Sequence, residues 1–373
     1  MNMYKAAETF APGEFLKDEL EARHWTQTEL AEIMGRPVRL VNEIIAGKKA
    51  VTPETAVQLG DALGTGPELW MNLESQYQLS KVQSTNGLVA RRAQLYGRFP
   101  VREMIKRGWV AGSKTIDVLE QQFIAFFGIA AVNDEPSFCH AAKKTQAEIQ
   151  PTMQQLAWLF RARQLASQLV VRPYQATAMR QALPRLSALR SAPRETRHVA
   201  SIMAECGIRF VVIEPIPGSK IDGACFWLPN DQPVIALSLR LDRIDNFWFV
   251  LRHEIEHVLQ QHGRDRAFIL DQDRDAAASE QMLDEELVAN RAAAEFCVPE
   301  SEISDFVARV GPPFPEHRMV LFANRIHVHP GLAAGQLQRR LGRYDLYRKH
   351  LVKVRSFVTA SALADGWGHV HSN

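Results

Sequence analysis

Residues 249–260 read FVLRHEIEHVLQ, and this pattern permits few folds. Apolar residues recur at helical spacing around a polar group formed by His253, Glu254 and His257. Because residues four apart lie one above the other on a helix, the two imidazoles share one face, and Glu254 points to an adjoining side. The segment therefore predicts a helix that packs against a core and presents two histidines to one point.

This arrangement is the H-E-x-x-H pattern of zinc-dependent hydrolases, in which both imidazoles bind one Zn²⁺ ion. The glutamate beside the first ligand can then deprotonate a water at the metal. A catalytic zinc also needs a third protein ligand and an open position. His262 stands one residue away from the third histidine of the longer metzincin pattern, so we interpret it as a surface residue.

The third ligand is expected downstream, in the segment DEELVANRAAAEFCVP at residues 284–299. Its alanines recur at helical spacing and would let a helix approach closely, which brings Glu286 towards the two histidines. On chemistry alone, four other carboxylates compete for this role: Glu285, Asp271, Asp273 and Asp275. No single residue stands out for stabilising a tetrahedral oxyanion, and the candidates are His327, His329 and Tyr344.

Three short β-rich segments precede the histidine helix, at residues 208–218, 221–228 and 233–239. Asn230, Asp231, Gln232 and Pro233 form a natural hairpin connection between the last two segments. We therefore expect a small antiparallel sheet packed on zincin-like helices, which is an α+β arrangement. Residues 81–193 have helical periodicity and form a helical connecting region without a recognisable chemical motif.

The N-terminal region reads as five short helices. Thr26 and Glu29 form a T-x-x-E capping box, Gly35 makes a turn, and a second helix begins near Pro37. Two helices joined by a short turn that contains glycine, the second of them basic on its outer side, form the helix-turn-helix pattern.

Three side chains are expected on the outer face of the second helix, where their forked donors can read guanine and adenine edges: Arg36, Arg39 and Asn42. Three more are better placed for backbone phosphates: Gln27, Lys48 and Lys49. The alternative is a small helical domain with a solvated basic face.

The segment from Thr26 to Leu79 resembles the XRE/Cro-type helix-turn-helix and, more narrowly, HigA-type antitoxins. This resemblance covers about the first fifth of the chain. It implies binding of double-stranded operator DNA as a homodimer, usually at the protein's own promoter.

The pair RHEIEH and EELVAN resembles the ImmA/IrrE group of metallopeptidases. The resemblance spans about residues 195–300 and implies that His253, His257 and Glu286 bind Zn²⁺. It implies further that Glu254 takes a proton from water and returns it to the leaving amine. One departure is Glu256, which stands where members of the group often have a small residue.

The composition adds limits to these interpretations. The net charge is +2, the four cysteines form no C-x-x-C pair, and no apolar run reaches the length of a membrane helix. Without a signal peptide, we expect a cytoplasmic protein. The expected fold is multidomain and mainly α, with a helix-turn-helix domain at 1–80, a helical region at 81–193, the metallopeptidase domain at 194–300 and a helical extension at 301–373.

Our leading hypothesis is a DNA-binding regulator that also cleaves a repressor, a toxin partner or another regulatory protein. The alternative is a HigA-like antitoxin and autorepressor whose peptidase-like domain only binds a partner and is catalytically silent. A structural metal is a third interpretation, but structural zinc sites are usually closed by four protein ligands.

Overall fold

The computed structural model of the chain describes residues 10–82, 87–138, 151–262, 264, 269–272 and 280–369. The chain divides into two compact units, residues 1–89 and 90–373. Within the described ranges, no helix is long and apolar enough to cross a membrane. The finer division of the chain at residues 193 and 300 stays a prediction.

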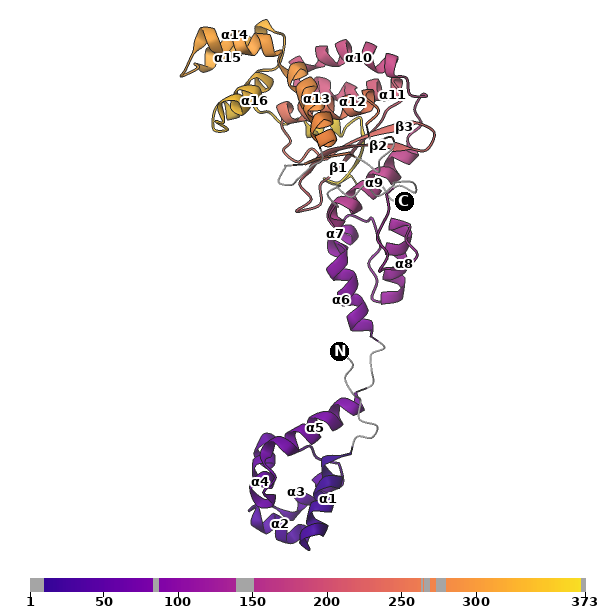
Figure 1. Ribbon diagram of the computed structural model, residues 1–373, viewed down its shortest axis with the longest axis vertical. Coiled ribbons are helices and arrows are strands. Elements are labelled where there is room, and N and C mark those ends of the chain that lie inside the picture. Colours follow the sequence, from indigo (N-terminus) through magenta and orange to yellow (C-terminus); the bar gives the residue numbers. More distant parts are fainter. Residues whose placement is uncertain are drawn as a thin grey trace. The chain divides into compact units, whose positions relative to one another are not determined.

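The described part of the first unit contains five helices up to residue 82 (Figure 1): α1 Pro12–Arg23, α2 Gln27–Ile33, α3 Val38–Ile45, α4 Pro53–Leu63 and α5 Pro67–Lys81. The Thr26 side chain accepts a hydrogen bond from the Glu29 amide, and the Glu29 carboxylate accepts one from the Thr26 amide at 2.6 Å. The capping box expected at the start of α2 is therefore confirmed. The five helices pack around a core that includes Leu16, Leu30, Val41, Leu59 and Trp70.

The second unit begins with six helices: α6 Leu88–Arg98, α7 Val101–Lys106, α8 Ile116–Phe127, α9 Met153–Gln168, α10 Ala176–Ala188 and α11 Val199–Glu205. Two short 3₁₀ turns, η1 Leu189–Ser191 and η2 Pro193–His198, lie between α10 and α11. The later helices are α12 Ile244–Leu259, α13 Glu280–Cys297, α14 Glu300–Val310, α15 Glu316–Arg325, α16 Pro330–Leu341 and α17 Arg355–Val358, with the 3₁₀ turn η3 Arg348–His350 before α17.

The second unit also contains a five-stranded sheet: β1 Arg209–Ile213, β2 Ile221–Leu228, β3 Gln232–Leu237, β4 Ile269–Gln272 and β5 Leu363–Asp365. The strand order is β4-β2-β3-β1-β5. The expected α+β class is confirmed, and the predicted hairpin joins β2 to β3 through Asn230 and Asp231, both with positive φ. The sheet is mixed, however, and not antiparallel throughout, because β1 pairs in parallel with both β3 and β5.

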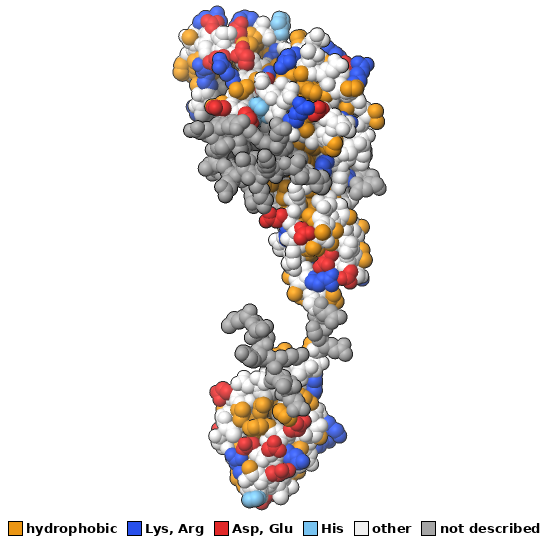
Figure 2. Space-filling view, turned by 45° about the vertical axis from the view of Figure 1, so that its right-hand side comes forward, with side chains coloured by type: hydrophobic (Ala, Val, Ile, Leu, Met, Phe, Trp, Pro, Cys, Tyr) orange, Lys and Arg blue, Asp and Glu red, His pale blue; other side chains and the backbone are white. Residues whose placement is uncertain are grey.

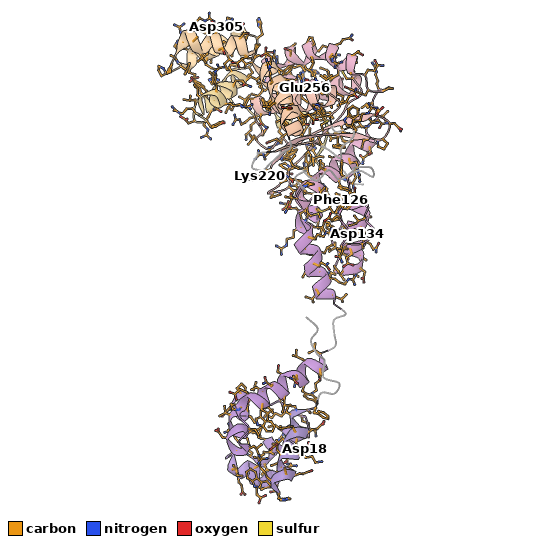
Figure 3. The ribbon with its side chains drawn as sticks, in the orientation of Figure 1. Asp18, Phe126, Asp134, Lys220, Glu256 and Asp305 are labelled. Carbon is orange, nitrogen blue, oxygen red and sulfur yellow. The ribbon has the colours of Figure 1, made fainter. Side chains whose placement is uncertain are left out.

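Helices cover both faces of the sheet (Figure 1), and the two cores follow the alternation of side chains along each strand. Phe210, Val212 and Cys225 face the core that contains α12. Val211 and Phe226 face the core that contains α8 and α9, where Phe126 is labelled in Figure 3. Helix α12 therefore packs on one face of the sheet.

The C-terminal extension is mostly helical but ends in β5, which the sequence did not predict. Asp365 forms an ion pair with Arg161 of α9, and both side chains are at most 1% exposed. The Asp365 carbonyl also accepts a hydrogen bond from the Glu214 amide at 2.8 Å. Segments about 200 residues apart in the sequence are thus joined by a buried charge pair.

We expect Asp365→Ala to destabilise the second unit by about 3–5 kcal/mol, because it leaves the Arg161 guanidinium buried without its carboxylate. Urea unfolding followed by hydrogen exchange would show faster exchange in β1 and unchanged exchange in α4. The matched control is Asp345→Ala, which removes an ion pair to Arg343 whose two side chains are about 60% exposed and which should therefore change stability far less. Equal effects of the two variants would contradict the expectation.

Candidate metal centre and nucleic-acid interface

Helix α12 is buried on nearly every side. Each residue from Val250 to Leu259 is buried, including the polar residues Arg252, Glu254 and Glu256. Burial of a polar or charged group costs free energy unless a partner compensates for it. A helix with this pattern therefore needs specific partners for its polar side chains.

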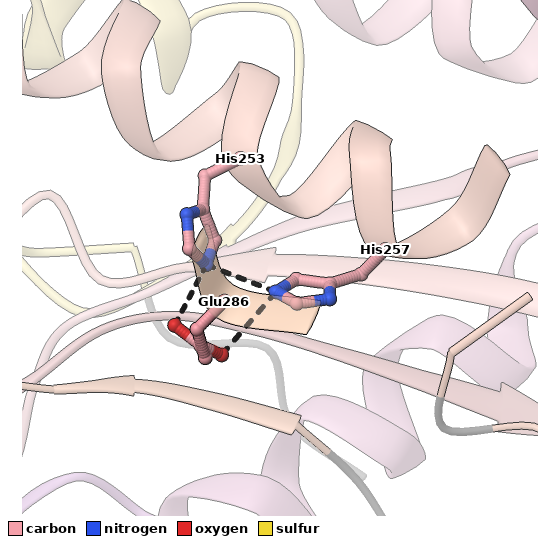
Figure 4. Close-up of side chains that lie close together, drawn as sticks. All are labelled: His253, His257 and Glu286. Carbon is pink, nitrogen blue, oxygen red and sulfur yellow. Dashed lines mark hydrogen bonds and ion pairs between the residues drawn. The ribbon is translucent and has the colours of Figure 1, made fainter. Parts of the chain in front are cut away.

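Three side chains converge beside α12 (Figure 4). The Nε2 atoms of His253 and His257 lie 3.0 Å apart, and Glu286 of α13 places its carboxylate oxygens 3.6 Å and 3.4 Å from them. Ligand atoms bound to a tetrahedral zinc ion at about 2.0–2.1 Å lie about 3.3 Å apart. The three separations bracket that value, so the donor set fits a small divalent ion.

The position of Glu286 follows from how α13 packs. Ala289 and Ala293 are fully buried in α13, and small side chains let two helices approach closely. Glu286 itself is 17% exposed, whereas both histidines are fully buried, so solvent reaches this group at Glu286 rather than at the histidines. Glu286, and not the neighbouring Glu285, belongs to this group of candidate metal ligands.

Glu254 is fully buried on the side of α12 that faces β2. A Cβ atom added to Gly223 of β2 would lie 2.7 Å from Oε1 of Glu254 and 2.7 Å from Cγ1 of Val250. The absence of a side chain at Gly223 therefore makes room for this carboxylate. The backbone of β2 limits the positions that the Glu254 side chain can take.

Glu256, the departure from the resembled family, is neutralised within its own helix (labelled in Figure 3). It accepts hydrogen bonds from Arg252 at 2.6 Å and from Gln260 at 2.7 Å. Burial raises the pKa of Glu256, but the two hydrogen bonds together with the charges of Arg252 and His257 outweigh burial and lower it overall. The additional carboxylate thus forms an ion pair with Arg252, which lies one helical turn before it.

His262 was expected at the surface, and the structure corrects this interpretation. Its Nδ1 lies 3.0 Å from Nδ1 of His257, and its backbone carbonyl accepts a hydrogen bond from the indole N–H of Trp227 at 3.0 Å. When His257 carries its proton on Nδ1 and shares it with His262, the Nε2 atom keeps its lone pair for an ion. The short separation of residues 257 and 262 along the chain could have indicated this contact. The comparison with the metzincin pattern, which His262 does not fit, led instead to the prediction of a surface residue.

The remaining candidates lie elsewhere. His329 is the N-cap of α16 and accepts a hydrogen bond from the Gly331 amide at 3.0 Å, and His327 and Tyr344 are exposed. Within the described ranges, neither His327 nor His329 belongs to the group of candidate metal ligands formed by His253, His257 and Glu286. Asp271 lies in β4, where only the backbone is described, and Asp273 and Asp275 lie outside the described residues.

Helix α3 presents the expected polar face. Arg39 and Asn42 are exposed and lie three residues apart, whereas Val41 and Ile44 are buried. Arg39 forms an ion pair with Glu43 at 2.7 Å, which lowers the pKa of Glu43. The exposed face of α3 therefore carries two of the three side chains that the sequence assigned to it.

Arg36 does not lie on that face, because α3 begins at Val38. Its guanidinium forms an ion pair with Glu54 and donates a hydrogen bond to Gln58 at 2.9 Å, both on α4. The prediction that Arg36, Arg39 and Asn42 share one face was therefore wrong. That Arg36 contacts nucleic acid stays a prediction.

Three further side chains assigned to phosphate contacts are exposed: Gln27, Lys48 and Lys49. Gln27 opens α2, and the amides of Lys48 and Lys49 both donate to the Glu43 carbonyl near the end of α3. Acidic and basic side chains are interspersed on the visible face of this unit in Figure 2. Lys48 and Lys49 thus lie on a surface of mixed charge.

The fold and the site define a protein with a helix-turn-helix unit and a second unit that holds a His-His-Glu centre. Residues 16–70 match the family model for the helix-turn-helix, and residues 205–311 match the model for the IrrE N-terminal-like domain, a peptidase family. The chain therefore joins a segment similar to the helix-turn-helix to a segment similar to the IrrE N-terminal-like domain.

Several known proteins are similar to about a fifth to a quarter of this chain. An uncharacterized HTH-type transcriptional regulator, YddM of Escherichia coli, is 28% identical over 81 residues, which is 22% of this chain and 86% of that protein. A putative antidote protein of a plasmid maintenance system from Nostoc punctiforme is 36% identical over 20% of this chain and 80% of its own, with a TM-score of 0.19. The Pseudomonas aeruginosa antitoxin HigA, solved with the higBA promoter, is 28% identical over 24% and 91%, also with a TM-score of 0.19.

We expect His262→Ala to weaken binding of a divalent metal ion by about 10–100-fold, because the variant removes the partner of the His257 Nδ1 atom. Titration with Co²⁺, followed by its visible absorption, measures this affinity without any substrate. His317→Ala, which removes an exposed histidine from α15, is the matched control and should bind Co²⁺ like the wild type. An unchanged affinity in His262→Ala would show that His262 does not hold the His257 ring.

Proposed function

We propose that the chain is a DNA-binding transcriptional regulator whose second unit is a zinc-dependent endopeptidase. The observation that carries this proposal is the convergence of His253, His257 and Glu286 beside the buried Glu254. Three protein ligands with solvent on one side are typical of catalytic zinc, since structural sites are usually closed by four. The match of residues 205–311 to a peptidase family supports the same reaction class.

In the proposed mechanism, bound Zn²⁺ would polarise a peptide carbonyl and lower the pKa of water to about 7. His253 and His257 bind through their Nε2 atoms, and Glu286 binds through its carboxylate. Glu254 accepts a proton from the attacking water and returns it to the leaving amine. The close contact with Gly223 restricts this carboxylate, so little conformational freedom is lost when the proton is transferred.

The helix-turn-helix unit supports a role in transcription. Arg39 and Asn42 would read base edges, and Gln27, Lys48 and Lys49 would contact phosphates, on double-stranded operator DNA bound by a homodimer. The substrate would be a repressor, a toxin partner or another regulatory protein in a stress, toxin-antitoxin or phage-defence switch. DNA as a partner supports a cytoplasmic protein, as do the free thiols of Cys206, Cys225 and Cys297 in the part of the chain that the structure describes.

Metal content tests the site. We expect about one Zn²⁺ per wild-type chain purified without chelator, and near-complete loss in His257→Ala, because two of three protein ligands cannot hold the ion tightly. His317→Ala serves as the control for loss of an exposed histidine. Wild-type chains that take up no zinc even after supplementation would end the proposal of a zinc peptidase.

Glu254→Gln separates catalysis from binding. The amide has the shape of the carboxylate but accepts no proton, so we expect zinc content and DNA binding to be kept and cleavage to fall at least about 100-fold. Cleavage is measured on a proteome-derived peptide mixture, with new amino termini counted by mass spectrometry. If neither chain produces new amino termini, and both relieve repression of the target promoter equally, the catalytically silent antitoxin becomes the better account.

We expect Asn42→Ala to lower affinity for operator DNA by about 1–3 kcal/mol through loss of a bidentate base contact. Lys49→Ala should instead weaken binding to all sequences and reduce the salt dependence by about one phosphate contact. Fluorescence anisotropy with selected and scrambled duplexes distinguishes the two effects. Lys17→Ala on α1, an exposed lysine paired with Glu21, is the control and should change neither quantity.

A further inference from the structure

Two rows of side chains run beside each other where α16 packs on α12. On α16 the row is Gly331, Gly335 and Arg339, and residues four apart share one helix face. A Cβ atom on Gly335 would lie 2.3 Å from the Asp245 carboxylate of α12, so the two helices are in close contact there. One turn further along both helices, the Arg339 guanidinium lies 5.0 Å from the centre of the Phe249 ring.

The row on α12 continues from Phe249 to a candidate metal ligand. Phe249 lies one turn before His253, and the two rings stack at a centroid distance of 6.4 Å with planes 28° apart. Phe249 is half-buried, whereas all of the residues that follow it in α12 are buried. Phe249 therefore links the Arg339 guanidinium to the His253 ring through two direct contacts.

Arg339 is the last charged group of its row. Helix α16 ends at Leu341, and Gly342 takes the left-handed conformation that closes it, so α16 does not extend to the level of His253. Arg339 is exposed, and among the described residues it makes no hydrogen bond or ion pair with another side chain. Its neighbour Arg340 is committed to α14 instead, through Glu300 at 2.7 Å and Ser304 at 3.0 Å.

The other charged side chains near the His-His-Glu centre differ from Arg339 in having a partner. The Arg252 guanidinium already neutralises Glu256, and a bound divalent ion would balance Glu254 and Glu286. Among the residues that the structure describes, Arg339 then has no ion-pair partner for its positive charge. An arginine stacked on an aromatic ring keeps its in-plane N–H donors free for a carboxylate, which it can bind in a bidentate manner.

We propose that Arg339 and Phe249 form a substrate-binding subsite that selects an acidic side chain close to the scissile bond. The two measured separations place the guanidinium at most about 11 Å from the His253 ring. An extended peptide advances about 3.3 Å per residue, so the selected Asp or Glu lies within about three residues of the cleaved bond. This subsite rests on the proposed peptidase function, and it narrows the substrates to regulatory proteins with an acidic residue at the cleavage site.

Cleavage profiles test the subsite in the full-length, zinc-loaded chain. In the wild type, acidic residues should be enriched within three positions of the cleaved bonds in a random dodecapeptide mixture. Arg339→Gln should reduce this enrichment about 5-fold or more, and Arg339→Glu should replace it with enrichment of Lys and Arg. Arg340→Gln, the matched control one residue away, should retain the wild-type profile. A wild-type profile without acidic preference, or one that Arg339→Gln leaves intact, overturns the proposal.

A binding assay separates failure of the subsite from failure of the peptidase. Fluorescein-labelled octapeptides with a central Asp-Asp or Lys-Lys pair are titrated into zinc-loaded Glu254→Gln chains with and without Arg339→Gln. Tighter binding of the Asp-Asp peptide that is lost with Arg339→Gln supports the subsite even if no chain cleaves anything. Cleavage by the wild type without any Arg339-dependent binding or profile keeps the peptidase and overturns the subsite, as does the absence of both activities.

Discussion

The imidazoles of His253 and His257 can bind one ion only if α12 keeps a fixed orientation about its axis and a fixed position in the second unit. The Nε2 atoms of His253 and His257 are 3.0 Å apart, so a small rotation of either ring would spoil the site. Packing on both sides of the helix prevents this: the sheet closes one side, and the alanines of α13 bring Glu286 to the other. The His262 contact then fixes one of the two rings. Much of the second unit thus serves to hold three donor atoms in place.

The features that the sequence predicted correctly are local ones. The Thr26 capping box, the β2–β3 hairpin and the helical spacing of His253 and His257 each depend on residues at most a few positions apart. The parallel pairing of β1 with β3 and β5 could not be read in this way, because it joins segments far apart in the chain and leaves no short-range periodicity. The buried pair of Arg161 and Asp365 is hidden for the same reason.

Side-chain partners explain the other differences. Arg36 has the spacing of a helix-face residue, yet the helix starts two residues later and α4 supplies Glu54 and Gln58 as partners. Arg339 and Arg340 are neighbours of one type in the sequence, and only packing distinguishes the one over Phe249 from the one paired with Glu300. Sequence patterns indicate which residues a helix exposes, but the neighbouring elements decide which of them stay available.

Gly223 differs from the other residues of β2 in what an amino-acid substitution there would affect. Most positions in that strand are constrained by packing, so their substitutions would be felt as lost stability. At Gly223 even one methyl group would lie 2.7 Å from the Glu254 carboxylate and 2.7 Å from the Val250 side chain, so both side chains would have to shift. Substitution there would displace the proposed proton acceptor while the sheet stays paired. In a library of variants sorted first for folding and then for cleavage, this position would pass the first selection and fail the second.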